Sequence, residues 1–162
     1  MDAPGSWPEA VERVSAALRE AGAEARLEEF AEGTPTAEDA ARAAGCELSQ
    51  IVKSLVFDCD GRAVLVLVPG DRRADTAKVA TVTGAAKAKV AGAALVEEAT
   101  GFPPGGVSPF GLRNVTRVLV DRRLLAEPLL WVGAGTERHM AGVPATELLR
   151  VSRGEPADVA GD

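Results

Sequence analysis

The sequence lacks most of the residues from which metal centres and catalytic triads are built. It contains a single histidine, two cysteines and no tyrosine among 162 residues. Cys46 and Cys59 show no CxxC spacing and no second histidine accompanies them, so neither a metal site nor any other cofactor site is predicted. Both cysteines are expected to be reduced thiols of a cytoplasmic protein.

Long apolar runs and clustered positive charge are also missing. No apolar run is long enough to cross a membrane as a helix, and Met1–Gly5 lacks the basic and apolar segments of a secretory signal. The net charge is -6, whereas proteins that grip nucleic acid through many phosphates are usually basic. A nucleic-acid partner would therefore be contacted over a small area or with the help of another protein.

Aromatic residues make up 4% of the chain, so its core has to be built from alanine, valine and leucine. Residues 1–153 are expected to form one domain and residues 154–162 a flexible tail. Apolar spacing predicts helices near residues 8–21, 36–44, 75–83, 93–100 and 144–151, and strands near 25–30, 51–57, 63–68, 118–120, 129–133 and 139–141. Strands that come as hairpins, with helices between them and no regular βαβ repeat, predict a mixed α/β (α+β-like) fold with a mixed or largely antiparallel sheet.

The most apolar hairpin carries one basic residue near its start. Residues 51–57 and 63–68 are separated by Asp60-Gly61, a dipeptide typical of tight turns. Lys53 interrupts the first strand. Its apolar stem could pack on the sheet while its ammonium group reaches solvent, or the ammonium group could be a fixed cation that faces a pocket.

Residues 101–111 combine four glycines and three prolines with Phe102, Val107 and Phe110. Such a segment is neither a helix nor a strand, and a flexible linker would have no use for its apolar residues. It is interpreted as an ordered loop, which serves either as a structural double turn or as a cradle whose bare backbone approaches a ligand.

The usual motifs of catalysis are absent. There is no GxSxG, Walker A or HExxH motif. A pair of His139 with Cys46 or Cys59 is conceivable, but His139 is better interpreted as structural or as a surface residue. Lys78, Lys87 and Lys89 favour a solvated face over a phosphate patch. The sequence thus predicts no protein nucleophile.

Two segments together resemble the YbaK/EbsC family, which is related to the editing domain of prolyl-tRNA synthetases. They are Ile51-Val52-Lys53-Ser54-Leu55 and the segment from Thr100 to Gly111, with support from residues 36–41 and 131–136. The similarity extends from about Ala25 to Val151.

This resemblance implies a compact α/β domain with a pocket on a curved mixed sheet, and a trans-acting activity that hydrolyses the ester of a mischarged tRNA. The implied substrate is tRNAPro carrying Cys, Ala or another small amino acid, held by its 3′ acceptor end, with prolyl-tRNA synthetase as a possible partner. Lys53, Gly105 and Gly106 would be catalytic. The free hydroxyl of the tRNA ribose, or the side chain of the substrate, would assist the reaction. Substrate-binding residues would be Phe30, Ser54, Gly101, Val107, Ser108, Pro109, Gly133, Gly135 and Thr136. Gly105, Gly106 and Ser108 would hold the ester carbonyl.

The sequence departs from the family pattern at two places. Met140 lies near a position where some members carry an Asp, and Phe30 replaces a polar aromatic residue. Both changes leave the amino-acid preference open. Two other hypotheses remain: a non-catalytic module that binds an aminoacyl group or docks on a synthetase, and a toxin-regulating or stress-linked homologue with another substrate.

Overall fold

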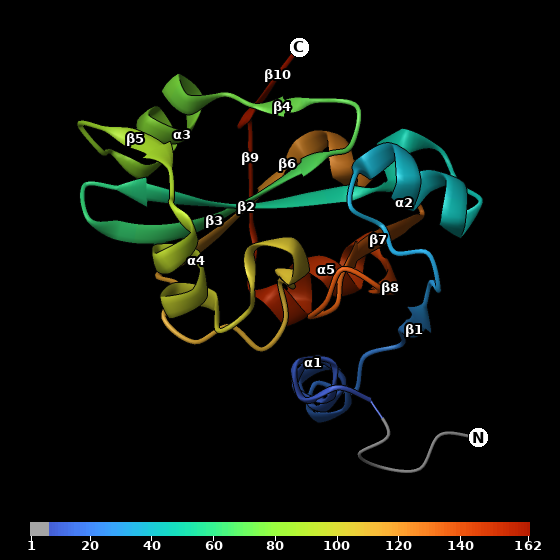
Figure 1. Ribbon diagram of the computed structural model, residues 1–162. Coiled ribbons are helices and arrows are strands. Elements are labelled where there is room, and N and C mark those ends of the chain that lie inside the picture. Colours follow the sequence, from blue (N-terminus) through green and yellow to red (C-terminus); the bar gives the residue numbers. More distant parts are fainter. Residues whose placement is uncertain (1–6) are drawn as a thin grey trace.

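A computed structural model describes residues 7–162 (Figure 1). Its central sheet has five strands in the order β5-β2-β3-β6-β9. The pairs of β2 with β3 and with β5 are antiparallel, whereas β3–β6 and β6–β9 are parallel, so the predicted mixed α/β fold with a mixed sheet is confirmed. The strands span Val52–Cys59 (β2), Arg62–Pro69 (β3), Ala88–Val90 (β5), Arg117–Asp121 (β6) and Glu155–Ala157 (β9).

A second, three-stranded antiparallel sheet has the order β1-β8-β7. It joins the central sheet through a bridge between Ile51 and Trp131, which places the start of β2 beside β7. A short pair, β4 with β10, lies apart from both sheets. These strands span Arg26–Glu29 (β1), Leu129–Gly133 (β7), His139–Pro144 (β8), Arg73–Ala74 (β4) and Ala160–Gly161 (β10).

Within residues 7–162, five α-helices lie where the sequence predicts them. Thr36 and Asp75 cap the second and third helices with their side-chain oxygens, as short polar side chains before a helix commonly do. Three 3-10 turns complete the fold. The helices span Glu9–Glu20 (α1), Ala37–Ala44 (α2), Thr76–Thr83 (α3), Ala93–Thr100 (α4) and Ala145–Ser152 (α5), and the turns Leu48–Gln50 (η1), Pro104–Gly106 (η2) and Arg122–Ala126 (η3).

The central sheet is buried on both faces, as the apolar run in β3 predicts. Alternate residues of β3 point to opposite sides, with Leu65 and Leu67 in one cluster and Val64 and Val66 in the other. Figure 1 shows α1, α4 and α5 on one side of β2 and β3, and α3 with β4 and β10 on the other. The first cluster includes Phe102 and Phe110, so the Gly/Pro loop is an ordered part of the core.

The prediction of a flexible tail at residues 154–162 is wrong. These residues form β9 and β10, and Val159 and Ala160 are fully buried. Both donate their backbone N–H groups to Oδ1 of Asp121, each at 3.1 Å. Because Asp121 is itself fully buried, these bonds supply partners that its carboxylate needs, and they fasten the segment to the second core cluster.

Candidate functional site

A cleft of about 230 Å³ lies where the start of β2 meets the Gly/Pro loop, the β7–β8 turn and the start of α2. The bridge between Ile51 and Trp131 sets this junction, because it brings the second sheet against β2. The cleft is lined by Thr34, Pro35, Thr36, Ala37, Ala40, Ile51, Val52, Lys53, Ser54, Leu55, Pro104, Gly105, Val107, Gly133, Thr136, His139 and Met140.

Lys53 is the single lysine or arginine among these lining residues. Its side chain is half-buried, and Nζ donates a hydrogen bond of 2.8 Å to the backbone carbonyl of Arg72. Arg72 follows the C-terminal end of β3, the strand that pairs with β2 in the hairpin. The ammonium group is therefore held in place by the backbone that follows β3, and Lys53 lines the cleft. Its role in binding or catalysis stays a prediction.

The two glycine-rich segments interlock along one wall of the cleft. A methyl group on Gly106 would overlap the carbonyl of Gly135, and one on Gly133 would overlap the carbonyl of Val107. Only bare backbone permits this approach. The glycines at these positions serve first to pack the Gly/Pro loop against the β7–β8 turn.

Within the loop, the structure separates the residues that the resemblance groups together. Gly105 and Val107 line the cleft, whereas Gly106, Ser108 and Pro109 are buried outside its lining. The N–H of Gly106 donates to the Pro103 carbonyl at 2.9 Å. The Ser108 hydroxyl accepts a hydrogen bond from the Phe110 N–H. Gly106 and Ser108 thus use these groups within the loop, and Gly105 is the loop glycine exposed to a ligand in the cleft.

Three other predicted residues also lie outside the lining. Gly101 ends α4 in the left-handed conformation, and its carbonyl accepts from Arg13 Nη2 at 2.6 Å. Gly135 packs on α1 at Ala10. Phe30 contacts Trp131 edge-on and lines a separate cavity between β1 and α2. Ser54, Gly133 and Thr136, in contrast, lie in the cleft lining as predicted.

Ser54 offers an available polar group there. Its Oγ is buried and, among residues 7–162, has no hydrogen-bond partner. A buried hydroxyl without a partner is costly, so a ligand group that reached Ser54 would gain a hydrogen bond.

His139 is a cleft residue that sequence reasoning assigned to a structural or surface role. It is 4% exposed, its Nδ1 lies 2.5 Å from Thr136 Oγ1, and its Nε2 lies 3.8 Å from Glu29 Oε2. Burial lowers the pKa of the imidazole; the Glu29 carboxylate opposes that effect and Arg138 adds to it. A neutral imidazole paired with a hydroxyl can orient water or a ligand, and it can accept a proton within the cleft.

The α2 side of the cleft was missed as well. Thr34 and Pro35 precede the helix, and Ala37 and Ala40 present small side chains to the cavity. The sequence did contain a signal for this wall. Alanines at positions 37, 40 and 41 follow a Thr cap, and their small side chains leave room between this helix face and the element that packs against it. The sequence alone did not indicate which neighbour that is.

Neither cysteine contributes to the cleft lining. Burial raises the pKa of both the Cys46 and the Cys59 thiol, which disfavours the nucleophilic thiolate. In the part of the chain that the structure describes, no group of three His, Cys, Asp or Glu side chains is placed to hold a metal ion. Over the same residues, no helix combines the length and the apolar character needed to cross a membrane.

Comparison with known families gives a match over most of the chain. The sequence model of the aminoacyl-tRNA editing domain matches residues 31–151. That range contains every residue of the cleft lining.

Curated relatives include proline–tRNA ligases. The chain is 35% identical to that of Desulforamulus reducens over 112 residues and 33% identical to that of Bacillus licheniformis over 143 residues. These matches cover 68% and 85% of this chain but only 20% and 25% of the ligases.

Two solved structures resemble the whole chain. One is described as a proposed trans-editing enzyme for prolyl tRNA synthetase; it has a TM-score of 0.90 and 35% identity, and covers 97% of this chain and 100% of that one. The other is a hypothetical protein, APE2540, with a TM-score of 0.85 and 31% identity, covering 92% of this chain and 99% of that one.

Proposed function

Because the chain belongs to the aminoacyl-tRNA editing domain family, we propose that it is a trans-acting deacylase that hydrolyses the ester between a wrongly attached amino acid and the tRNA 3′-terminal ribose. The observation that carries the proposal is the lysine ammonium group, which is fixed by Arg72 at a cleft walled by bare backbone. A structure that is similar over 97% of this chain and described as a proposed trans-editing enzyme for prolyl tRNA synthetase supports the trans-acting role.

The proposed substrate is tRNAPro carrying Cys, Ala or another small amino acid. A cleft of about 230 Å³ suits a small side chain together with part of a ribose. Ile51, Leu55 and Met140 supply apolar lining. Discrimination between amino acids that differ by one methylene in such a pocket is about 10- to 200-fold, so several small residues are expected to be accepted to different degrees.

The proposed chemistry uses no protein nucleophile. The ammonium group of Lys53 places positive charge near the ester or the terminal phosphate, where it stabilises developing negative charge. Gly105 lets the backbone approach the ester, and the free Ser54 hydroxyl is available to orient it. A ribose hydroxyl or the side chain of the substrate activates water, and positioning supplies much of the remaining acceleration.

The pair of Thr136 and His139 could instead be interpreted as a nucleophile with its base, because Thr136 Oγ1 and His139 Nδ1 lie 2.5 Å apart. We assign it the role of orienting water or substrate. Thr136→Val is then expected to lower kcat about 10-fold without abolishing turnover. A covalent acyl-enzyme at Thr136, trapped by acid quench and detected by mass spectrometry, would contradict this assignment.

The first test of the proposed function is Lys53→Met, assayed on Ala-tRNAPro and Cys-tRNAPro. The variant keeps the aliphatic stem but loses the charge, so deacylation is expected to fall about 100-fold while the melting temperature stays close to that of the wild type. Lys87→Met is the matched control, because Lys87 is exposed and does not line the cleft. Equal activity of wild type and Lys53→Met would remove Lys53 from the mechanism.

The alternative, a non-catalytic module that binds an aminoacyl group or docks on prolyl-tRNA synthetase, differs in one measurable respect. Such a protein would bind a non-hydrolysable aminoacyl-adenosine amide without turning over any member of a panel of mischarged tRNAs. Addition of the synthetase to the same panel tests whether that partner is required.

A further inference from the structure

The ammonium group of Lys53 is held by a single peptide unit outside the cleft. Its acceptor is the carbonyl of Arg72, at 2.8 Å, and that carbonyl shares a planar peptide unit with the N–H of Arg73. No peptide bond among residues 7–162 is cis. The carbonyl and the N–H of this unit therefore point in opposite directions, and whatever binds the Arg73 N–H sets the direction of the Arg72 carbonyl.

The partner of Arg73 is β10, in the last residues of the sequence. In the β4–β10 ladder Ala74 pairs with Ala160, and Arg73 pairs with Gly161. The Asp75 N–H donates to the Val159 carbonyl at 2.8 Å, one pair further along. Hydrogen-bonded pairs alternate along an antiparallel ladder, so the next such pair is Arg73 with Gly161. The Arg72–Arg73 peptide is thus fixed by Gly161 on one side and offers its carbonyl to Lys53 on the other.

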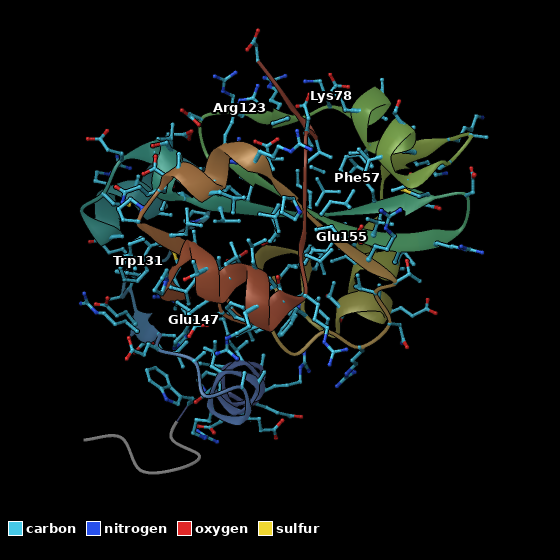
Figure 2. The ribbon with its side chains drawn as sticks, turned by 180° about the vertical axis from the view of Figure 1, so that it is seen from behind. Phe57, Lys78, Arg123, Trp131, Glu147 and Glu155 are labelled. Carbon is cyan, nitrogen blue, oxygen red and sulfur yellow. The ribbon has the colours of Figure 1, made fainter. Side chains whose placement is uncertain are left out.

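Several contacts anchor β10 independently of the cleft. Buried Asp121 accepts the N–H groups of Val159 and Ala160. Lys78, labelled in Figure 2, donates from Nζ to the Ala160 carbonyl at 2.9 Å. Arg72 forms an ion pair of 2.7 Å with Asp162, which adds a direct link from β10 to the residue that holds Lys53.

We propose that the C-terminal segment 158–162 is a positioning element for Lys53, acting through the peptide between Arg72 and Arg73. Gly161 is its key residue. The segment contributes nothing to the cleft lining and lies beyond residues 31–151, which the family model matches. The proposal rests on the proposed function only for its effect on deacylation, since the effect on the Lys53 amine is measurable without any substrate.

The test removes the Gly161 carbonyl, which accepts the Arg73 N–H in this pair. A chain shortened to residues 1–160 lacks this carbonyl, while the bonds of Asp121 to Val159 and Ala160 keep the rest of the segment in place. Gly161→Ala is the matched control, because it keeps the carbonyl and its Cβ would make an ordinary contact of 3.5 Å with Asp75. Asp162→Asn tests the ion pair to Arg72 separately.

The first readout is the rate at which acetic anhydride labels Lys53 in the wild type and in each variant, determined by peptide mapping with exposed Lys87 as internal reference. Release of the amine from the Arg72 carbonyl in the chain 1–160 is expected to raise the ratio of Lys53 to Lys87 labelling about fivefold, the factor that corresponds to one typical hydrogen bond. Gly161→Ala is expected to leave the ratio unchanged. An equal ratio in wild type, chain 1–160 and Gly161→Ala would overturn the proposal.

The second readout is deacylation of Ala-tRNAPro. Shortening the chain to residues 1–160 is expected to lower kcat/KM about fivefold in the wild-type background and to have no effect in the Lys53→Met background. An equal loss in both backgrounds would show a general structural effect and would contradict positioning through Lys53. If the wild type hydrolyses no mischarged tRNA, the proposed function fails, whereas the labelling ratio still decides whether β10 positions the amine.

Discussion

The side chain of Lys53 is already ordered in the absence of a ligand. A free lysine side chain that becomes immobilised loses about 2 kcal/mol of rotamer freedom. In this chain the cost is met during folding, because the Arg72 carbonyl already holds the ammonium group. Binding of substrate then does not have to order Lys53, which is an advantage for the role that we propose for its ammonium group.

His139 gives the chain a defined response to pH. Burial lowers its pKa below the usual value of about 6.5. The unfolded chain then binds more protons than the folded one at pH values just below about 6.5, so the free energy of unfolding decreases as the pH falls through that window. We expect melting temperatures to decline between pH 7 and pH 5.5, a range in which no other side chain ordinarily titrates.

The control is His139→Gln, which keeps a polar group beside Thr136 but cannot become charged. Its absolute stability is expected to be lower than that of the wild type, so the informative quantity is the slope of melting temperature against pH. The slope between pH 7 and pH 5.5 should be close to zero in the variant because the chain has no other histidine. Identical slopes in the two proteins would refute a lowered pKa at His139.

At this scale, sequence reasoning singled out Lys53 but did not place His139 in the cleft lining. Lys53 stands out because a charge interrupts an apolar strand, and the family resemblance marks the same position. Nothing local marks His139 as a cleft residue. Its surroundings include the segment before α1 and the end of β1, since Trp7 meets its ring edge-on and Glu29 lies 3.8 Å from Nε2. Such contacts between distant segments are not visible in the spacing of residues.

Among the structural elements, the Gly/Pro loop is expected to tolerate a substitution at Gly105 but not at the adjacent Gly106. A methyl group on Gly106 would overlap the backbone of Gly135, which cannot move without separating the loop from the β7–β8 turn. Gly106→Ala is expected to lower the free energy of unfolding by about 1 to 3 kcal/mol and to reduce deacylation. Denaturant titration and steady-state kinetics measure the two effects.

Gly105→Ala is the matched control. Its methyl group would meet the side chain of Glu137, which is exposed and can swing away. The change in stability is therefore expected to stay within about 0.5 kcal/mol. If Gly105→Ala and Gly106→Ala were equally stable, the interlocking of the two segments would not be what requires a glycine at position 106.

The elements that the sequence predicts are those with strong local patterns. The β2–β3 hairpin has a continuous apolar strand and an Asp60-Gly61 turn, and α2 and α3 have side-chain caps. The C-terminal strands were missed because they are short and carry few apolar residues. Their strand conformation comes from pairing with β6 and β4 and from Asp121, so it is decided by distant partners rather than by local propensity.

For the whole molecule, the net charge of -6 limits how the protein can bind RNA. Each phosphate that a protein neutralises releases counterions and makes binding weaker as salt rises. The cleft lining offers one lysine and no arginine, so few phosphates near the 3′ end can be engaged from it. Recognition is then concentrated on the aminoacyl ester and terminal ribose rather than on the body of the tRNA.

This predicts a shallow dependence of deacylation on salt. Each contact with a single-stranded phosphate contributes about -0.7 to the slope of log(kcat/KM) against log[salt], so a protein that engages one or two phosphates should show a slope no steeper than about -1.5. The measurement compares Ala-tRNAPro with 3′-alanyl-adenosine between 50 and 300 mM salt, concentrations at which a contact of this kind is resolved. The small substrate has no phosphate and should give a slope near zero. A slope of about -4 or steeper for the tRNA alone would mean that the protein grips the acceptor stem through a surface outside the cleft. The acidic character of the chain would then have to be offset by local basic residues or by a synthetase that presents the tRNA.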